Sequence, residues 1–286
     1  MKLARRCVAC EGDGLERSPA VLMPFVAWRV FGWEPTEIGP DWGLRDLKPG
    51  AAYSVCASVS CRDCGMLFLD MRFDDEEMAA LYEDYRGEAY SNQRERFEPG
   101  YKARNSLLLD GSAYIEAVET FLRPHLETDR PRVLDWGGDT GVNTPFRTKS
   151  SRCDIYDISS RPLLPGAARV TRDDIQGVEY DLVVFANVLE HVSNPREAVA
   201  ALAEAMGPRT LLYLEVPHEE VVRTIADPAT RLRSKRHWHE HINFFTADAL
   251  DVVFRQAGLR IVERISHPVF AGGKESHVFS IAACRL

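Results

Sequence analysis

The sequence lacks any long run of apolar residues. Its most apolar stretch, residues 21–33, is about half as long as a bilayer span requires, and it contains Arg29. The first ten residues, MKLARRCVAC, carry charge but no apolar segment of the kind that directs secretion. Since neither a membrane anchor nor an export signal is evident, we expect a cytoplasmic protein without a membrane partner.

Positive charge is also scarce. The chain of 286 residues has 35 Lys and Arg against 43 Asp and Glu, which gives a formal net charge of −8. This balance argues against a nucleic-acid partner. One basic cluster, RLRSKR at residues 231–236, has two interpretations: a solvated loop, or a clamp for a phosphorylated substrate.

Glycine, by contrast, is concentrated in one informative place. Residues 133–146, VLDWGGDTGVNTPF, lead from an apolar pair through Asp135 to Gly137, Gly138 and Gly141. This order predicts a buried strand that ends at a tight turn and continues as a helix, where the backbone approaches a ligand closely. The GxxxxGK[ST] loop of nucleoside triphosphate sites and the GxGxxG dinucleotide pattern are both missing. The segment predicts a site for a nucleotide-like cofactor, with a plain strand–helix connection as the alternative.

Two later segments extend this prediction. Residues 153–159, CDIYDIS, form a short strand that ends in Asp157, about twenty residues after the glycine turn, where an acid accepts hydrogen bonds from a ribose. Asp173 and Asp174 then precede residues 180–192, YDLVVFANVLEHV, an apolar run that opens into a helix start. Taken alone, the Glu-His pair in this run is most simply an exposed helix start without a chemical role.

In this order and spacing, the three segments resemble class I S-adenosylmethionine-dependent methyltransferases. The resemblance implies S-adenosylmethionine as cofactor, with Asp157 on the ribose and Asp173 or Asp174 near the adenine. Asp139 stands where the family usually has its middle glycine. The cofactor-binding residues implied by the resemblance are Asp135, Gly137, Gly138, Gly141, Asp157, Ile158, Asp173, Asp174, Asn187, Leu189 and His191.

The rest of the chain alternates strand and helix patterns, which predicts an α/β fold with a doubly wound, mostly parallel sheet. Two final strands, separated by Gly272 and Gly273, are expected to pair antiparallel. The resemblance implies a seven-stranded, Rossmann-like methyltransferase sheet. We predict a zinc-binding module at residues 1–72, a helical linker and lid at 73–125 and a cofactor domain at 126–286. The polar segment 88–99 is expected to be a loop, either a lid that folds over the cofactor or simply a mobile connection.

Cysteine is unusually patterned for a chain with no export signal, which argues against disulfides. Four of the seven cysteines form two CxxC pairs, Cys7 with Cys10 and Cys61 with Cys64, which predict a tetrahedral structural zinc site. The gap between the pairs is long, but loop-closure entropy grows slowly with length. A redox pair and unrelated buried thiols are the alternatives, and Cys56 is a possible substitute ligand.

The last signal is HWHEHINFFT at residues 237–246, which lacks the zinc-protease pattern HExxH. It resembles a Tyr-His-Glu-His segment of sugar methyltransferases that carry an N-terminal zinc module and act on nucleotide-linked deoxysugars. The resemblance implies base chemistry by Glu240 and His241, beside His239, while Trp238 replaces the tyrosine. A packed histidine that binds a backbone carbonyl is the alternative for His241. His218 and Glu219 are second-tier candidates at the same sheet edge.

Together these patterns predict a methyltransferase that acts on a small molecule, with a nucleotide-linked sugar or a surface-polysaccharide precursor as the favoured acceptor. Histidine titrates near neutral pH and suits the removal of a proton from that acceptor. The Trp238 ring is expected to stack on the acceptor. The alternatives are O- or N-methylation of another metabolite, and a catalytically idle, zinc-anchored protein that binds S-adenosylmethionine.

Overall fold

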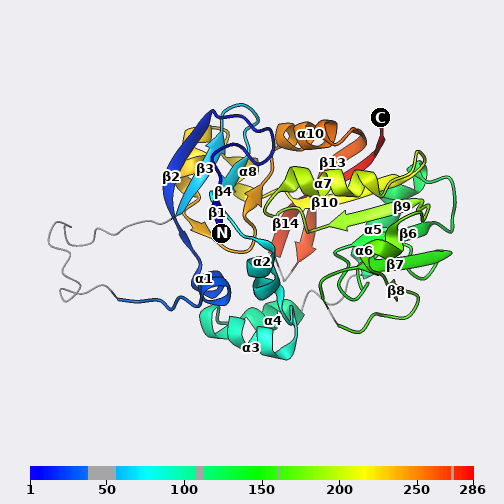
Figure 1. Cartoon of the computed structure of the whole chain (residues 1–286), viewed down its shortest axis with the longest axis horizontal. Helices are drawn as coiled ribbons and strands as arrows, with labels where there is room; N and C mark the ends of the chain where they lie inside the picture. The colour runs from blue at the N-terminus through cyan, green and yellow to red at the C-terminus, as the bar shows by residue number, and fades with distance from the viewer. Residues whose placement is uncertain (38–55, 107–111, 160, 272–273) are drawn as a thin grey trace.

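The computed structural model describes residues 1–37, 56–106, 112–159, 161–271 and 274–286. These residues form a large sheet and a smaller one, which lie side by side (Figure 1). The predicted glycine turn at 272–273 lies outside the described residues, as does the centre of the predicted helix at 103–121. Among the described residues, none of the helices combines the length and the apolar character that a bilayer span requires.

The large sheet has seven strands in the order β13-β14-β10-β9-β6-β7-β8. Strands β8, β7, β6, β9 and β10 are parallel, and β14 pairs antiparallel with both β10 and β13. The predicted fold class is confirmed. The strands are β6 (Arg132–Trp136), β7 (Arg152–Tyr156), β8 (Ala168–Arg169), β9 (Leu182–Ala186), β10 (Leu211–Pro217), β13 (Leu259–Ala271) and β14 (Lys274–Arg285).

Strand order reverses between β6 and β9, which creates the crevice where sheets of this kind bind ligands. Strands β9 and β10 are apolar on both faces because helices cover both sides. On one face, Val183 and Leu214 pack with α7 (Pro195–Glu204) and α10 (Ala247–Gln256). On the other face, Val184 packs with α5 (Ser112–Leu122), which precedes a short 3-10 helix, η2 (Arg123–His125).

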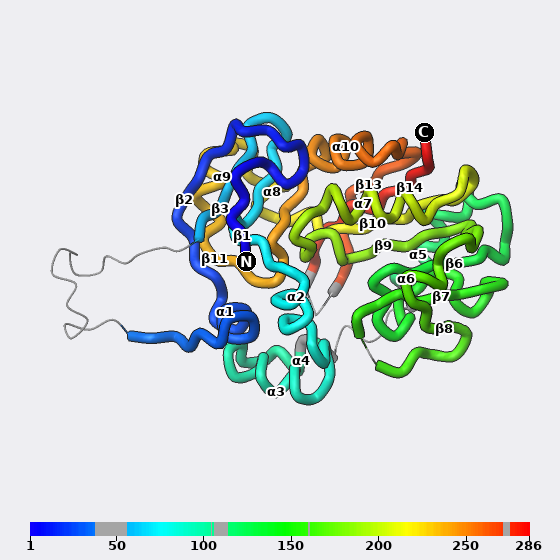
Figure 2. The backbone as a smooth tube through the Cα atoms, viewed as in Figure 1, coloured from blue at the N-terminus to red at the C-terminus, as the bar shows by residue number. Residues whose placement is uncertain are grey.

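The smaller sheet has the order β11-β2-β3-β4-β12 and is assembled from distant parts of the chain. Its central strands are β2 (Leu15–Leu22), β3 (Cys56–Cys61) and β4 (Leu67–Leu69). Its edge strands, β11 (His237–Trp238) and β12 (Asn243–Phe244), come from the segment with alternating histidines. Figure 2 shows β11 from this late segment beside β2. The division at residues 72 and 125 stays a prediction, but residues 1–72 alone lack two strands of their sheet.

Short helices fill the space beside this sheet: α1 (Pro24–Phe31), α2 (Asp75–Tyr82), α3 (Glu88–Phe97), α4 (Tyr101–Ser106), α8 (Glu220–Thr224) and α9 (Pro228–Ser234). A ribbon of β1 (Lys2–Leu3) and β5 (Met71–Arg72) and the single-turn helix α6 (Arg172–Ile175) complete the described elements. The acids after residue 73 begin α2 as expected, with a capping box between Asp74 and Glu77.

The predicted loop at residues 88–99 is wrong, because most of it is helix α3. The helix has little apolar periodicity, so its stability comes from tertiary contacts of two residues one turn apart. Tyr90 is buried against Phe25 and Tyr85. Arg94 is buried too, with its guanidinium over the rings of Phe25 and Tyr101.

Candidate active site

A cavity of about 910 Å³ opens at the carboxyl ends of β6, β9 and β10. This is the crevice at the reversal of strand order, and its volume suits a sizeable organic ligand. Its walls come from the glycine turn, the segment after β9, the end of β10, the loop between β11 and β12, the turn between α2 and α3, and the hairpin of β13 and β14.

The glycine turn forms one wall of this cavity, through Gly137, Gly138 and Asp139. A Cβ atom on Gly137 would lie 2.4 Å from Val188, so glycine is needed here for packing against the segment after β9. The predicted helix after the turn is wrong, since residues 138–149 are a series of turns. Pro145 lacks an amide donor and Phe146 adopts φ of 59°, and both oppose a helix.

Asp139 adopts φ of 49°, in the left-handed region that the family's usual glycine favours and that aspartate tolerates. Its backbone amide donates to Asp157, at 2.8 Å, and its carboxylate accepts from Arg161, also at 2.8 Å. Asp157 therefore fastens the glycine turn from the end of β7, although it does not line the cavity. Ile158, next to it, is 72% exposed.

Four further residues expected to contact the cofactor lie outside the cavity lining. Asp173 and Asp174 are exposed, and the Asp174 carboxylate caps α6 by accepting the amide and hydroxyl of Thr171. Leu189 is fully buried in the core. Gly141, with φ of 77°, also lies outside the lining and packs toward Arg147.

Asp135 and Asn187 do line the cavity, and each is held by a defined partner. Asp135 is buried and accepts the Thr144 hydroxyl at 2.5 Å; burial raises its pKa from 3.8 to about 7. Asn187 donates from its side chain to Glu215 at 2.9 Å. Glu215 and Tyr114, which also donates to it, are cavity residues that sequence reasoning missed. The signal for Glu215 was an acid inside the apolar run LLYLEV.

Elsewhere in the cavity lining, Glu190, His191 and His241 bring their ligand-capable atoms within 4.8 Å of one another. The segment after β9 and the loop before β12 are fastened together, because the amides of Ile242 and Asn243 donate to the Glu190 carbonyl. The rings of His191 and His241 lie 4.7 Å apart. The Glu-His pair is therefore part of the cavity, and its interpretation as an exposed helix start is wrong.

The pKa values of the His191 and His241 imidazoles are shifted in opposite directions. Burial lowers the pKa of His191 to about 3, so this ring is neutral. Burial also lowers the pKa of His241, but its hydrogen bond to Glu219 and the nearby carboxylates outweigh burial and raise it overall. Burial raises the pKa of Glu190 to about 7.

His241 pairs with Glu219 rather than with its neighbour Glu240. His241 Nδ1 lies 2.9 Å from a Glu219 carboxylate oxygen. Glu240 instead forms an ion pair with Arg94 at 2.7 Å. Burial opposes the charge of Glu240, yet His239 and Arg94 hold its pKa well below the usual range. His239 lies outside the cavity lining, and its Nδ1 accepts the His241 amide at 3.2 Å.

On the acceptor side, the expectation for Trp238 is wrong, and the clamp interpretation of residues 231–236 loses its first residue. Trp238 has no exposed surface, and its indole nitrogen donates to the Ser58 hydroxyl at 2.8 Å, so its ring cannot stack on an acceptor. It is a core residue of the smaller sheet because β11 pairs with β2. Arg231 is also buried and donates to the carbonyls of Ile225 and Gly65, which removes the first residue of the proposed phosphate clamp.

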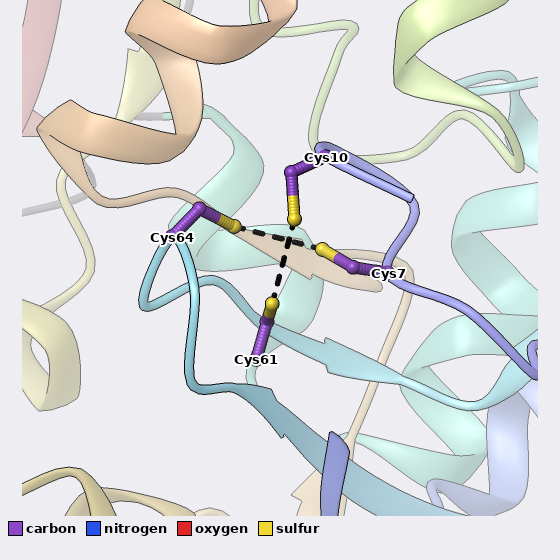
Figure 3. A group of neighbouring side chains, drawn as sticks. All are labelled: Cys7, Cys10, Cys61 and Cys64. Carbon is purple, nitrogen blue, oxygen red and sulfur yellow. Dashed lines mark hydrogen bonds between the residues drawn. The ribbon is translucent and has the colours of Figure 1, made fainter. Parts of the chain in front are cut away.

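The four cysteines of the CxxC pairs meet at one point (Figure 3). The Sγ atoms of Cys7 and Cys64 are 3.6 Å apart, and those of Cys10 and Cys61 are 3.5 Å apart. Four thiolates about 2.3 Å from a central zinc ion lie about 3.8 Å from one another in a tetrahedron. The amides of Ala9 and Gly12 point at the sulfurs of Cys7 and Cys10. The arrangement fits a structural zinc ion.

Comparisons with known proteins give matches along most of the chain. A family model described as a methyltransferase domain matches residues 103–264. The chain is similar to the solved 1,6-didemethyltoxoflavin-N1-methyltransferase of Burkholderia thailandensis, with 17% identity, 84% of this chain and 99% of that chain covered, and a TM-score of 0.49. It is also similar to the magnesium protoporphyrin IX methyltransferase of Synechocystis PCC 6803, with 14% identity, coverage of 73% and 100%, and a TM-score of 0.48. A search of curated proteins gives no match.

Proposed function

The chain belongs to the methyltransferase-domain family, and on this premise we propose that it transfers a methyl group from S-adenosylmethionine to a small molecule bound in the cavity. One observation carries this proposal. The cavity at the reversal of strand order has the glycine turn on one wall and a carboxylate–histidine pair, Glu219 and His241, on another. A donor and an acceptor therefore have separate parts of the lining to bind.

We assign cofactor binding to predicted residues that line the cavity and to Asp157, which fastens the glycine turn. Asp135, Gly137, Gly138 and Asn187 face the cofactor, and Asp157, which lies just outside the lining beside Asp139, would reach the ribose. When bound, S-adenosylmethionine supplies a methyl group on a sulfonium, which already carries a good leaving group. Holding donor and acceptor in line supplies roughly 7–11 kcal/mol of the barrier.

For the acceptor, we propose that His241 takes the proton. Its Nδ1 donates to Glu219, which fixes the ring orientation and leaves Nε2 as the acceptor nitrogen. Glu240 and His239 support the loop: Glu240 through its ion pair with Arg94, and His239 through the His241 amide. A nucleotide-linked sugar remains the first acceptor class, since Arg86 and Arg223 line the cavity and suit its phosphates.

The test uses purified full-length protein, methyl-labelled S-adenosylmethionine and a pool of nucleotide-linked sugars. Label in a sugar nucleotide supports the whole proposal, and label in another small metabolite corrects the acceptor class alone. Micromolar cofactor binding in calorimetry without incorporation into any pool would identify a catalytically idle binding protein instead.

We also propose that Cys7, Cys10, Cys61 and Cys64 bind one structural zinc ion. The separations of the sulfurs support this, and so does the closed donor set, which leaves no position for a substrate. The ion sits where β3 ends, in the sheet that also carries β11 and β12. Its role is to hold the sheet that presents the His241 loop.

A further inference from the structure

Glu190 is the most anomalous polar group of the cavity. Its side chain is 1% exposed, and within the part of the chain that the structure describes neither carboxylate oxygen has a hydrogen-bond partner. Buried polar groups without a partner are rare, and an ion at the site is one of the few physical explanations. The residue lines the cavity, although its two carboxylate oxygens have almost no exposed surface of their own.

Two imidazoles flank this carboxylate, and each has its Nδ1 engaged elsewhere. Nδ1 of His191 lies 3.0 Å from the Glu240 carbonyl and 2.7 Å from the Tyr82 hydroxyl. Nδ1 of His241 lies 2.9 Å from Glu219. Metal-binding histidines characteristically donate one ring nitrogen to a carbonyl or carboxylate, which fixes the tautomer and presents the other nitrogen to the metal.

The remaining nitrogens are the Nε2 atoms, and that of His191 is 3.6 Å from a Glu190 oxygen. Ligand atoms bound at about 2.0–2.2 Å to one ion lie roughly 3–3.5 Å apart. All ligand-capable atoms of the cluster lie within 4.8 Å of one another, so they must approach by about 1 Å or little more to hold one ion.

We propose that Glu190, His191 and His241 bind a divalent cation, with its other coordination positions open to the cavity. Two imidazoles and one carboxylate suit Mn²⁺, Fe²⁺, Co²⁺ or Zn²⁺ and differ from the thiolate donors of the cysteine cluster. The open positions take oxygen atoms of the acceptor, such as a hydroxyl or carboxylate group. The site thus selects acceptors that carry metal-binding oxygens next to the methylated atom.

This inference rests on the proposed function and changes one part of it. In the filled site Nε2 of His241 is a ligand, so the acceptor hydroxyl binds the cation instead of the imidazole. A divalent cation lowers the pKa of a bound hydroxyl strongly, and the proton then leaves to water. The ionised oxygen bonds to the methyl carbon as the carbon–sulfur bond breaks, with its electron pair kept by sulfur. His241 serves as the base only while the cation is absent.

The experiment counts metal ions on the purified chain after its four cysteines have been supplied with one equivalent of zinc. Titration with Mn²⁺, followed by the magnetic resonance signal of the free ion, should reveal one further equivalent. Glu190→Gln, which keeps the side-chain volume, should remove that equivalent. His267→Gln is the matched control, since His267 lines the same cavity outside the cluster, and it should retain it. Glu219→Gln should weaken Mn²⁺ binding by about 10–100-fold, as loss of a partner to a ligating histidine does.

Absence of a second equivalent with both Mn²⁺ and Co²⁺ would overturn the inference, and so would full Mn²⁺ binding by a folded Glu190→Gln protein. Circular dichroism and calorimetry with S-adenosylmethionine check that each variant is folded. Failure of the proposed function is distinguishable, since it is a loss of cofactor binding or methyl incorporation. Methyl transfer by cation-free protein, unchanged by added Mn²⁺, would also refute the role of the cation in holding the acceptor.

Discussion

Asp135 makes a strong prediction, since a carboxylate buried in the glycine turn costs stability. Its pKa is raised by burial from 3.8 to about 7, so the folded protein holds a proton there that the unfolded chain releases. Each pKa unit corresponds to about 1.4 kcal/mol, so the full shift amounts to roughly 4 kcal/mol. Below pH 4 the carboxyl is protonated in both the folded and the unfolded chain, so it imposes no penalty on folding. As the pH rises from 4 through 7, the folded protein loses this amount of stability, because the buried group holds a proton that the unfolded chain releases.

The perturbation is Asp135→Asn, which is neutral at every pH and still accepts the Thr144 hydroxyl. We expect the variant to be more stable than the wild type at pH 8, by up to about 4 kcal/mol, and this advantage to shrink to about 1–2 kcal/mol at pH 5. The assay is urea unfolding of both proteins at several pH values, and taking their difference cancels the other titrating groups.

The functional counterpart is weaker binding of S-adenosylmethionine by Asp135→Asn, measured by calorimetry at pH 8, because the ionised carboxylate faces the cofactor wall. Functional sites often retain such destabilising groups. A stability difference that stays constant between pH 5 and 8 would refute the reasoning, since it would mean that Asp135 does not change its proton occupancy on folding.

Three further variants test the rest of the site. Cys61→Ser should lose the single zinc ion and, with it, methyl transfer, while cofactor binding persists; metal analysis showing full retention of zinc would contradict this. In protein without a cation at Glu190, His191 and His241, His241→Gln should lower turnover by about 10²–10⁴-fold with cofactor affinity unchanged. Near-full turnover by this variant would show that His241 is not the base. Asp157→Ala should weaken cofactor binding in calorimetry, both by loss of the ribose contact and by release of the Asp139 amide; micromolar binding unchanged by the variant would show that the assignment of the ribose acid is wrong.

The parts of this molecule that sequence reasoning predicts are those encoded locally. A buried strand, its glycine turn and the apolar run of β9 each depend on residues close in sequence, so their order predicts the sheet. The misses depend on contacts across the chain. Helix α3 is held by Tyr90 and Arg94 against the ring of Phe25, more than sixty residues earlier, and such a contact leaves no periodic pattern in the local sequence.

The site shows the same division. The sequence places His241 in a functional loop, but its partner lies 22 residues earlier, at Glu219, and the nearer acid turns to Arg94 instead. Trp238 resembled an acceptor contact because it stands where the similar segment of sugar methyltransferases has a tyrosine. Pairing of β11 with β2 turns its ring inward, and only the assembled sheet reveals this.

The late edge strands of the smaller sheet have a consequence for biosynthesis. During translation, β2, β3 and β4 leave the ribosome long before residues 237–244, and domains generally fold as they emerge. Until β11 and β12 are synthesised, the three-stranded sheet has unpaired edges at β2 and β4, and such edges are prone to intermolecular strand addition. Early capture of the metal by the four thiols would give this nascent half-sheet a fixed shape. We expect low zinc in growth medium to reduce the soluble yield of this chain more than its rate of synthesis.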